Sequence, residues 1–293
     1  MRTVIVTGAA GFIGMNLVSV LLRKGYYIYA IVRPESEHNS RLTENSHLKI
    51  IYLDMRNIKN LGNYILNPCD VFVHLAWEGP RDDFELQQRN INYAVNSVEI
   101  ASEIGCKRFL CTGSQAEYGL QTSVMTETTL PNPNTSYGVA KLAACYLTRH
   151  RAAQLNIEWI WGRIFSVYGK YEPSTTLVSY LMNSLKNGIV PQMTGATQNW
   201  DYLYSEDAGE AIVALIERAR SGEIYNIANG NYRSLKDFSE MIKTEIAPNA
   251  VINYGNNQKD IVSLQPLVNK IKIDTGWFAK TKFIEGIKLI YNL

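Results

Sequence analysis

The sequence is short of the features that mark secreted, membrane-bound and metal-binding proteins. Its 293 residues include four cysteines, and none of them stands in a C-x-x-C pair or at another metal-ligand spacing. No apolar run in it approaches the roughly 20 residues that a helix needs to cross a bilayer. The net charge is only +2, which gives no bulk attraction to nucleic acid or to an anionic membrane.

These absences favour a protein of the reducing cytoplasm. Scattered free thiols are typical of that compartment. The first apolar segment begins at residue 4, so we expect no signal peptide. We therefore expect a cytoplasmic protein with no bound metal, no membrane partner and no nucleic-acid partner.

The N-terminus carries a glycine-rich turn between a strand and a helix. Residues 4–6 are apolar and predict a buried strand, and residues 15–23 predict a helix. Between them, Gly8, Gly11 and Gly14 have a G-x-x-G-x-x-G spacing. In such a turn the glycines permit a tight bend, a close approach to a pyrophosphate, and helix–strand packing. A helix N-terminus also favours a phosphate, so we expect a dinucleotide site; the alternative is a tight turn without a ligand.

Short apolar segments alternate with helical patterns along the first half of the chain. Strands are expected at residues 27–32, 48–53, 71–76, 108–112 and 157–164, and long helices at residues 87–104 and 137–155. This alternation predicts an α/β fold of the Rossmann type, a doubly wound parallel sheet with helices on both faces.

Beyond residue 165 the loops lengthen and the pattern becomes less regular. Residues 1–165 are expected to form the dinucleotide-binding domain, and residues 166–293 mainly a smaller C-terminal α/β lobe that binds substrate. A strand and a helix from about residues 200–230 are expected to return to the first domain. Within that stretch, Trp200, Tyr202 and Tyr204 alternate as in a half-buried strand.

Arg33 follows the second expected strand, where dinucleotide sites select between the two nicotinamide cofactors. An acid there holds the adenosine ribose 2′-hydroxyl and favours NAD, whereas an arginine pairs with a 2′-phosphate and favours NADP. No Asp or Glu stands at that place, so Arg33 favours NADP over NAD. The alternative is an exposed arginine at a strand end without a ligand.

A second cluster of residues, around Tyr137, indicates a group that could donate a proton to a substrate. Tyr137 and Lys141 are four residues apart and share one face of an expected helix. A free phenol has a pKa near 10, and a nearby ammonium stabilises its phenolate, which is how a tyrosine becomes a proton donor at neutral pH. Alone, such a pair is usually a solvated pair. Ser114 at the end of a central strand, together with the glycine-rich turn, makes it a candidate catalytic set.

Together these motifs resemble those of the extended short-chain dehydrogenases/reductases, in the branch of NAD(P)-dependent nucleotide-sugar epimerases, dehydratases and reductases. The resemblance covers about residues 3 to 245. Its segments are T-G-A-A-G-F-I-G at residues 7–14, H-L-A at 74–76, Y-G-V-A-K at 137–141, R-I-F-S-V-Y-G at 163–169 and W-D-Y-L-Y-S-E-D at 200–207.

The resemblance implies roles for individual residues. It implies catalysis by Ser114, Tyr137 and Lys141. The residues expected beside the cofactor are Gly8, Ala10, Gly11, Phe12, Ile13, Gly14, Arg33, Asp54, Met55, Leu75, Ala76, Trp77, Asn90, Thr112, Tyr137, Lys141, Arg163, Phe165 and Ser166. Those expected beside the substrate are Ser114, Gln115, Glu117, Ser166 and Trp200, the alternative for Glu117 being a loop carboxylate without a ligand. A homodimer through helices 87–104 and 137–155 is also implied.

The residues that depart from the family pattern limit which of the family's reactions we expect this chain to catalyse. Sugar-nucleotide 4,6-dehydratases of this family carry an Asp-Glu pair after the catalytic Ser or Thr, whereas this chain has Gln115 and Ala116. The acid–base pair for water elimination is therefore missing. Ser166 replaces the family asparagine, and Trp200 replaces an arginine that often contacts the diphosphate. Arg33 argues against an epimerase that retains NAD through its cycle.

These observations favour a reductase that uses NADPH to reduce a 4-keto-6-deoxy sugar linked to a nucleoside diphosphate, as in deoxysugar and surface polysaccharide biosynthesis. The alternatives are a nucleotide-sugar 4-epimerase, a small carbonyl reductase of the dihydroflavonol-reductase type, and a NADP-binding sensor without catalysis. A sensor needs no proton donor, so the joint presence of Ser114, Tyr137 and Lys141 argues against it.

Overall fold

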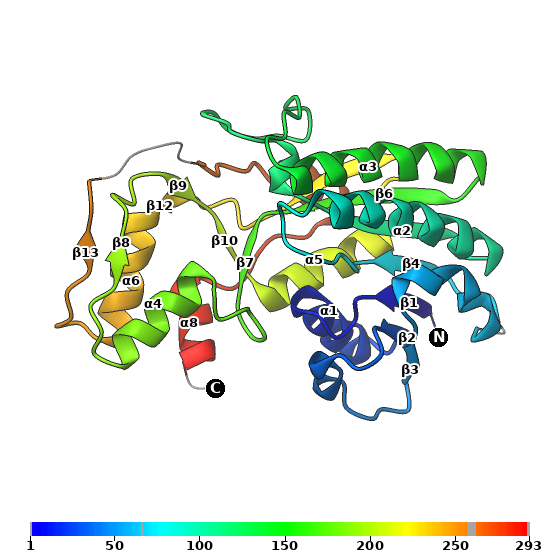
Figure 1. Cartoon of the computed structure of the whole chain (residues 1–293), viewed down its shortest axis with the longest axis horizontal. Helices are drawn as coiled ribbons and strands as arrows, with labels where there is room; N and C mark the ends of the chain where they lie inside the picture. The colour runs from blue at the N-terminus through cyan, green and yellow to red at the C-terminus, as the bar shows by residue number, and fades with distance from the viewer. Residues whose placement is uncertain (1, 66, 257–261, 292–293) are drawn as a thin grey trace.

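A computed structural model describes residues 2–65, 67–256 and 262–291 of the chain. The molecule has two unequal parts, a larger one built on a parallel sheet and a smaller one that contains most of the C-terminal elements (Figure 1). This is the predicted architecture, a doubly wound α/β fold with a smaller C-terminal lobe.

In the described part of the chain, a seven-stranded sheet with parallel pairing forms the centre of the larger part. Its strands, in order across the sheet, are β11 (Glu223–Ile227), β6 (Glu158–Ile164), β5 (Arg108–Ser114), β4 (Val71–His74), β1 (Thr3–Thr7), β2 (Tyr27–Val32) and β3 (Leu48–Tyr52). The chain order reverses between β1 and β4. Loops that leave these two strands diverge, which opens a crevice at their carboxyl ends.

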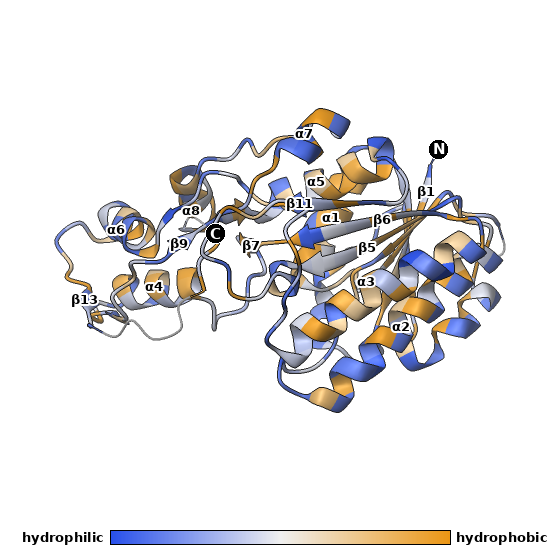
Figure 2. Ribbon diagram, turned by 90° about the horizontal axis from the view of Figure 1, so that it is seen from above, coloured by the Kyte–Doolittle hydropathy of each residue, from blue (hydrophilic) through white to orange (hydrophobic). Residues whose placement is uncertain are grey.

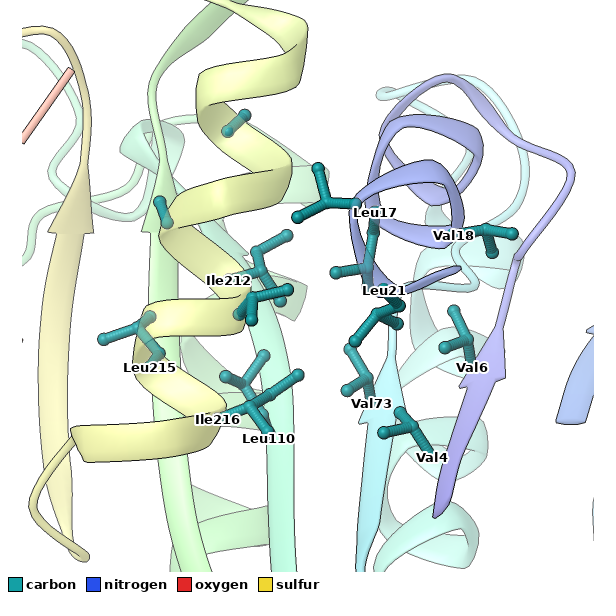
Figure 3. Packing of buried hydrophobic residues seen from close by; sticks show 14 of the residues in the cluster. Val4, Val6, Leu17, Val18, Leu21, Val73, Leu110, Ile212, Leu215 and Ile216 are labelled. Atoms are coloured by element: carbon teal, nitrogen blue, oxygen red, sulfur yellow. The ribbon is translucent and has the colours of Figure 1, made fainter. Parts of the chain in front are cut away.

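Helices cover both faces of the sheet (Figure 2). One face carries α1 (Phe12–Arg23) and α5 (Ser205–Arg218), and the other carries α2 (Phe84–Glu103) and α3 (Ser136–Gln154). Alternate residues of a strand point to opposite faces. Val4 and Val6 therefore pack with Leu17 and Ile212 (Figure 3), whereas the intervening Ile5 belongs to the core on the α2–α3 side.

The smaller part has its own apolar core. Its helices are α4 (Leu177–Lys186), α6 (Leu235–Ile246) and α8 (Phe283–Tyr291), and its short strands are β7 (Ser166–Tyr168), β8 (Gln192–Met193), β9 (Asn199–Trp200), β10 (Tyr202–Tyr204), β12 (Arg233–Ser234) and β13 (Asn253–Tyr254). Four aromatic rings form its centre, because Tyr168 and Tyr202 pack against Phe283 at 5.0 and 5.5 Å between ring centroids, and Phe238 packs against Phe283 at 4.6 Å.

The structure differs from the expectations mainly where elements are short. Between β3 and β4 the chain forms a 3₁₀ segment, η2 (Met55–Asn63), with a kink at Asn57, and its apolar residues predict a short helix at residues 58–65 instead. Tyr202, Leu203 and Tyr204 are all buried, because β10 lies between β7, α5 and α8, so the half-buried strand expected there is wrong. A further helix, α7 (Asn269–Thr275), was not indicated by the sequence pattern and packs on α5 and β11. Among the described residues, no helix is both long and apolar enough to cross a membrane.

Candidate active site

Glycine shapes the turn between β1 and α1. Gly8 has a φ of 68°, and a Cβ there would lie 2.9 Å from the backbone nitrogen of Ala76. A Cβ at Gly14 would lie 2.1 Å from the carbonyl oxygen of Gly8. Gly11 is the N-cap of α1, and no described side chain caps that end. The first N–H groups of the helix are therefore free to bind an anion.

Replacing Gly14 by alanine is expected to destabilise the protein and to weaken dinucleotide binding. The added Cβ would meet backbone oxygens of Gly8 and Ala9 at 2.1 and 2.7 Å, so the turn itself must move. We expect a loss of about 1–3 kcal/mol in the free energy of unfolding, measured by urea denaturation. Gly62→Ala is the matched control, because its Cβ would meet only Ile100 Cδ1, at 3.8 Å. Equal losses in both variants would contradict the close packing of Gly14.

A cavity of about 360 Å³ opens beside this turn. Ten of the residues expected beside the cofactor line it: Gly8, Ala10, Gly11, Arg33, Asp54, Met55, Leu75, Ala76, Trp77 and Asn90. Ser36, His38 and Asn39 also line it, and no motif in the sequence marked them. The cavity thus joins the glycine-rich turn to the carboxyl ends of β2, β3 and β4.

Of two charged residues in this cavity, Asp54 is paired with a neighbouring side chain and, within the residues that the structure describes, Arg33 is not. Both carboxylate oxygens of Asp54 accept hydrogen bonds from Arg56, at 2.8 and 3.0 Å, and this arginine lowers the pKa of Asp54. Arg33 is exposed, and among the described residues it has no carboxylate partner at ion-pair distance. Its guanidinium is therefore available to a phosphate.

A second cavity, of about 480 Å³, lies at the carboxyl ends of β5 and β6. It brings together the three residues expected to be catalytic, Ser114, Tyr137 and Lys141. The other expected residues that line it are Phe12, Ile13, Leu75, Trp77, Thr112, Gln115, Phe165, Ser166 and Trp200. Leu75 and Trp77 line both cavities, so the two spaces meet at the end of β4.

Helix α3 places Tyr137 and Lys141 on the wall of the second cavity. Thr135 caps the helix by accepting a hydrogen bond from the Gly138 N–H at 3.1 Å, which fixes its first turn. Lys141 is only 4 % exposed. Its Nζ donates to the Thr112 carbonyl at 2.8 Å and lies 3.6 Å from the centre of the Trp77 ring. The Tyr137 ring centre is 5.9 Å from the same ammonium.

His74 lines neither of the two cavities. It is fully buried at the end of β4, and burial and the Lys141 charge lower its pKa to about 3. The imidazole is therefore neutral at physiological pH. Its Nδ1 lies 2.9 Å from Thr7 Oγ1 and 3.2 Å from Ser97 Oγ, which ties β4 to β1 and α2.

Three of the expected residues do not reach either cavity. Gly14 lies behind the turn, against the backbone of Gly8 and Ala9. Glu117 and Arg163, expected beside substrate and cofactor, are 0 and 1 % exposed and pair with each other beneath the strand ends. A loop carboxylate and a strand arginine of opposite charge lose their hydration together when they pair in the interior.

Sequence reasoning missed two charged residues of the second cavity. Arg81 lies 5.0 Å from the Tyr137 ring centre, and its carbonyl accepts the Tyr137 N–H at 3.0 Å. Glu172 lies near the N-terminus of α4, and burial raises its pKa to about 7. Both belong to irregular loops, where no periodicity or spacing marks a side chain as part of a site.

Comparisons with known proteins agree with this geometry. Residues 4–228 match the model of the NAD dependent epimerase/dehydratase family. The chain is 23 % identical to CDP-abequose synthase of Salmonella muenchen and 24 % identical to dTDP-4-dehydro-6-deoxyglucose reductase of Escherichia coli. These alignments cover 100 and 99 % of this chain and 98 and 97 % of the relatives.

A solved structure shows the same fold. UDP-glucuronic acid 4-epimerase from Bacillus cereus, in complex with NAD, superposes with a TM-score of 0.88 at 24 % identity, over 99 % of this chain and 96 % of the epimerase. The family resemblance predicted from the motifs is thereby confirmed. The chain belongs to the NAD-dependent epimerase/dehydratase family of enzymes.

Proposed function

We propose that this enzyme reduces the ketone of a 4-keto-6-deoxy sugar linked to a nucleoside diphosphate, with NADPH as reductant. The observation that carries the proposal is the second cavity. Ser114 from the end of β5 and Tyr137 and Lys141 from α3 line it, and Ser114 is followed by Gln115 and Ala116 where a dehydratase has two acids. Reduction needs one proton donor, whereas elimination of water needs an acid and a base.

The first cavity fits a dinucleotide. Its glycine turn leaves no room for a Cβ at Gly8 or Gly14, and the free N–H groups at the start of α1 suit a pyrophosphate. Arg33 suits a 2′-phosphate and supports NADP over NAD. NADPH bound there supplies the hydride that adds to the ketone carbon.

The residues of the chain supply orientation and the proton. Tyr137 donates its phenolic proton to the oxygen that becomes the new hydroxyl group, and Ser114 donates a hydrogen bond to the same oxygen. Lys141 supplies the positive charge that stabilises the phenolate left behind. Its Nζ sits between Thr112 and Trp77, at the junction of the two cavities.

Incubation with NADPH and nucleoside-diphosphate 4-keto-6-deoxy sugars tests the proposal. We expect one NADPH to be consumed for each sugar reduced, followed by the loss of NADPH absorbance and by mass spectrometry of the alcohol. Interconversion of nucleotide sugars with no net use of cofactor would instead identify a 4-epimerase. A preceding screen of CDP, dTDP, GDP and UDP for thermal stabilisation in the presence of NADPH identifies the base.

Nucleotide-sugar binding is expected to weaken as the pH rises through 7. Below its pKa of about 7, Glu172 is neutral; above it, the group becomes an anion in the cavity expected to hold the diphosphate. Repulsion of about 1 kcal/mol corresponds to about a fivefold rise in Kd, measured by calorimetry between pH 6 and 8. Glu172→Gln should remove this pH dependence. The same slope in that variant would assign it to another group.

We also propose that residues 166–293 contribute the substrate lobe and that the enzyme is a cytoplasmic homodimer. Trp200 and Tyr202 of the smaller part line the second cavity, which supports the first point. Helix α3 leaves Val139, Tyr146 and Leu147 about half exposed, which supports association through α2 and α3. Light scattering is expected to give twice the chain mass, and a monomer would exclude this dimer.

A further inference from the structure

The ion pair of Glu117 and Arg163 lies directly beneath Ser114. Glu117 Oε1 accepts a hydrogen bond from the Ser114 backbone N–H at 2.8 Å. Its Oε2 accepts from Arg163 Nε at 2.7 Å, and Trp161 Nε1 donates to the same carboxylate at 3.0 Å. The carboxylate therefore links the end of β5, which carries Ser114, to two residues of the neighbouring strand β6.

The hydroxyl group of Ser114 is oriented by the same local structure. Ser114 caps the 3₁₀ turn η3 (Gln115–Glu117), and its Oγ accepts a hydrogen bond from the Ala116 N–H at 3.2 Å. With a lone pair of Oγ engaged in this way, the hydroxyl proton is left to donate elsewhere. Glu117 completes the capping box from the other side by holding the Ser114 N–H.

Gly113 provides the space for this arrangement. A Cβ at Gly113 would lie 2.1 Å from both Glu117 Oε1 and Trp161 Nε1. The glycine before Ser114 thus permits the carboxylate to reach back to the strand end. Residues 113–117, G-S-Q-A-E, therefore form one structural unit. Gly113 provides the space and Glu117 the hydrogen bond that position Ser114.

Stability alone does not account for the pair. A buried ion pair is often no more stabilising than apolar residues of the same size, because both charges lose their hydration. Arg163 Nη1 has no hydrogen-bond partner among the described residues, so the desolvation of this arginine is incompletely compensated. A pair of apolar residues would lose two contacts of the carboxylate, the one to Trp161 Nε1 and the one to the Ser114 N–H, and the second holds a residue of the candidate site.

We propose that Glu117 is a positioning residue that holds the backbone of Ser114, so that its hydroxyl proton points to the substrate carbonyl oxygen, and that Arg163 holds Glu117 in place. This inference rests on the proposed reduction, in which Ser114 donates to that oxygen. It replaces the direct contacts with substrate and cofactor expected for Glu117 and Arg163.

The test compares the effect of Ser114→Ala in two backgrounds. In the native background this change removes one hydrogen bond to a developing anion and is expected to lower kcat about 30-fold. Glu117→Leu/Arg163→Met removes both charges together. In that background we expect kcat to be about tenfold lower than in the native protein. Adding Ser114→Ala should then lower kcat by less than about threefold more, because Ser114 and the ion pair are coupled.

Two readouts separate positioning from general damage. NADPH affinity should be unchanged, because neither residue lines the first cavity. Hydrogen exchange of the Ser114 amide should quicken by at least about tenfold when its acceptor is removed. Glu223→Gln/Lys270→Met is the matched control; it removes an ion pair with an Nζ–Oε2 distance of 2.6 Å from edge strand β11, and the 30-fold effect of Ser114→Ala should persist there.

A full-sized loss from Ser114→Ala in the Glu117→Leu/Arg163→Met background, or unchanged exchange of the Ser114 amide, would overturn the inference. If this double variant does not fold, Glu117→Asp carries the same test, because it keeps the charge opposite Arg163 but shortens the reach to Ser114. Failure of the proposed function is distinct, since it shows as no NADPH oxidation by the native protein with any nucleoside-diphosphate 4-keto-6-deoxy sugar.

Discussion

Replacing Tyr137 by phenylalanine is expected to lower kcat by about 10²–10⁴-fold, the range for loss of a positioned proton donor. The change removes one oxygen from the wall of the second cavity and leaves the ring in place. The ring keeps its neighbours, because the guanidinium carbon of Arg81 lies 5.0 Å from its centre and the centre of the Trp77 ring lies 6.1 Å from it. The affinity for NADPH, measured by fluorescence titration, should therefore change by less than about twofold.

The control for this experiment is a tyrosine outside the cavities. Tyr146 lies on α3 as well but is half exposed and lines neither cavity. Tyr146→Phe should leave kcat at its native value, which excludes a general effect of losing a phenol from this helix. Normal activity of Tyr137→Phe would show that another group donates the proton, and Glu172, whose carboxyl group lines the same cavity, would be the next residue to replace.

Replacing Arg33 by alanine is expected to weaken NADPH binding by about 10²-fold, the loss of a charged hydrogen-bond pair with a phosphate. NADH has a 2′-hydroxyl where NADPH has the phosphate, so its affinity should fall by less than about threefold. Calorimetric titration of both dinucleotides measures the difference. The prediction depends on the exposed position of Arg33 on the wall of the first cavity.

Arg41→Ala is the matched control for Arg33. Arg41 also follows β2, but its guanidinium contacts the Ala10 carbonyl at 3.4 Å and lies 5.1 Å from the Tyr171 ring centre. Its loss should weaken both dinucleotides to the same extent. If Arg33→Ala lost the same affinity for NADPH and for NADH, Arg33 would not bind the 2′-phosphate, and NAD would be the better candidate for the cofactor.

Sequence patterns predict the large elements of this fold because each of them buries one face. Strands β1 and β2 and helices α2 and α3 repeat apolar residues with the period of their structure, and the structure has them within a few residues of the expected bounds. The strands of two or three residues in the smaller part are too short to show a period. Their pairing depends on neighbours that are distant in the chain.

The site is predictable to the extent that its residues share a motif. Ser114, Tyr137 and Lys141 come from a strand end and one helix face, and the parallel sheet brings them into a single cavity. Glu117 and Arg163 show the limit, because a sequence gives the charges but not their burial or their pairing. Arg81 and Glu172 come from loops, where placement depends on the whole fold.

The path of the chain between the two parts has a consequence for how such an enzyme changes its substrate. After β6 the chain enters the smaller part, returns with α5 and β11, leaves again through β12 and α6, and comes back as α7 before ending in α8 (Figures 1 and 2). Neither part is a continuous length of chain, so recombination at a single point cannot exchange one intact part for another. Substitutions in place, for example in β7 and β10, which contribute residues to both cores, can change the substrate site without interrupting this path.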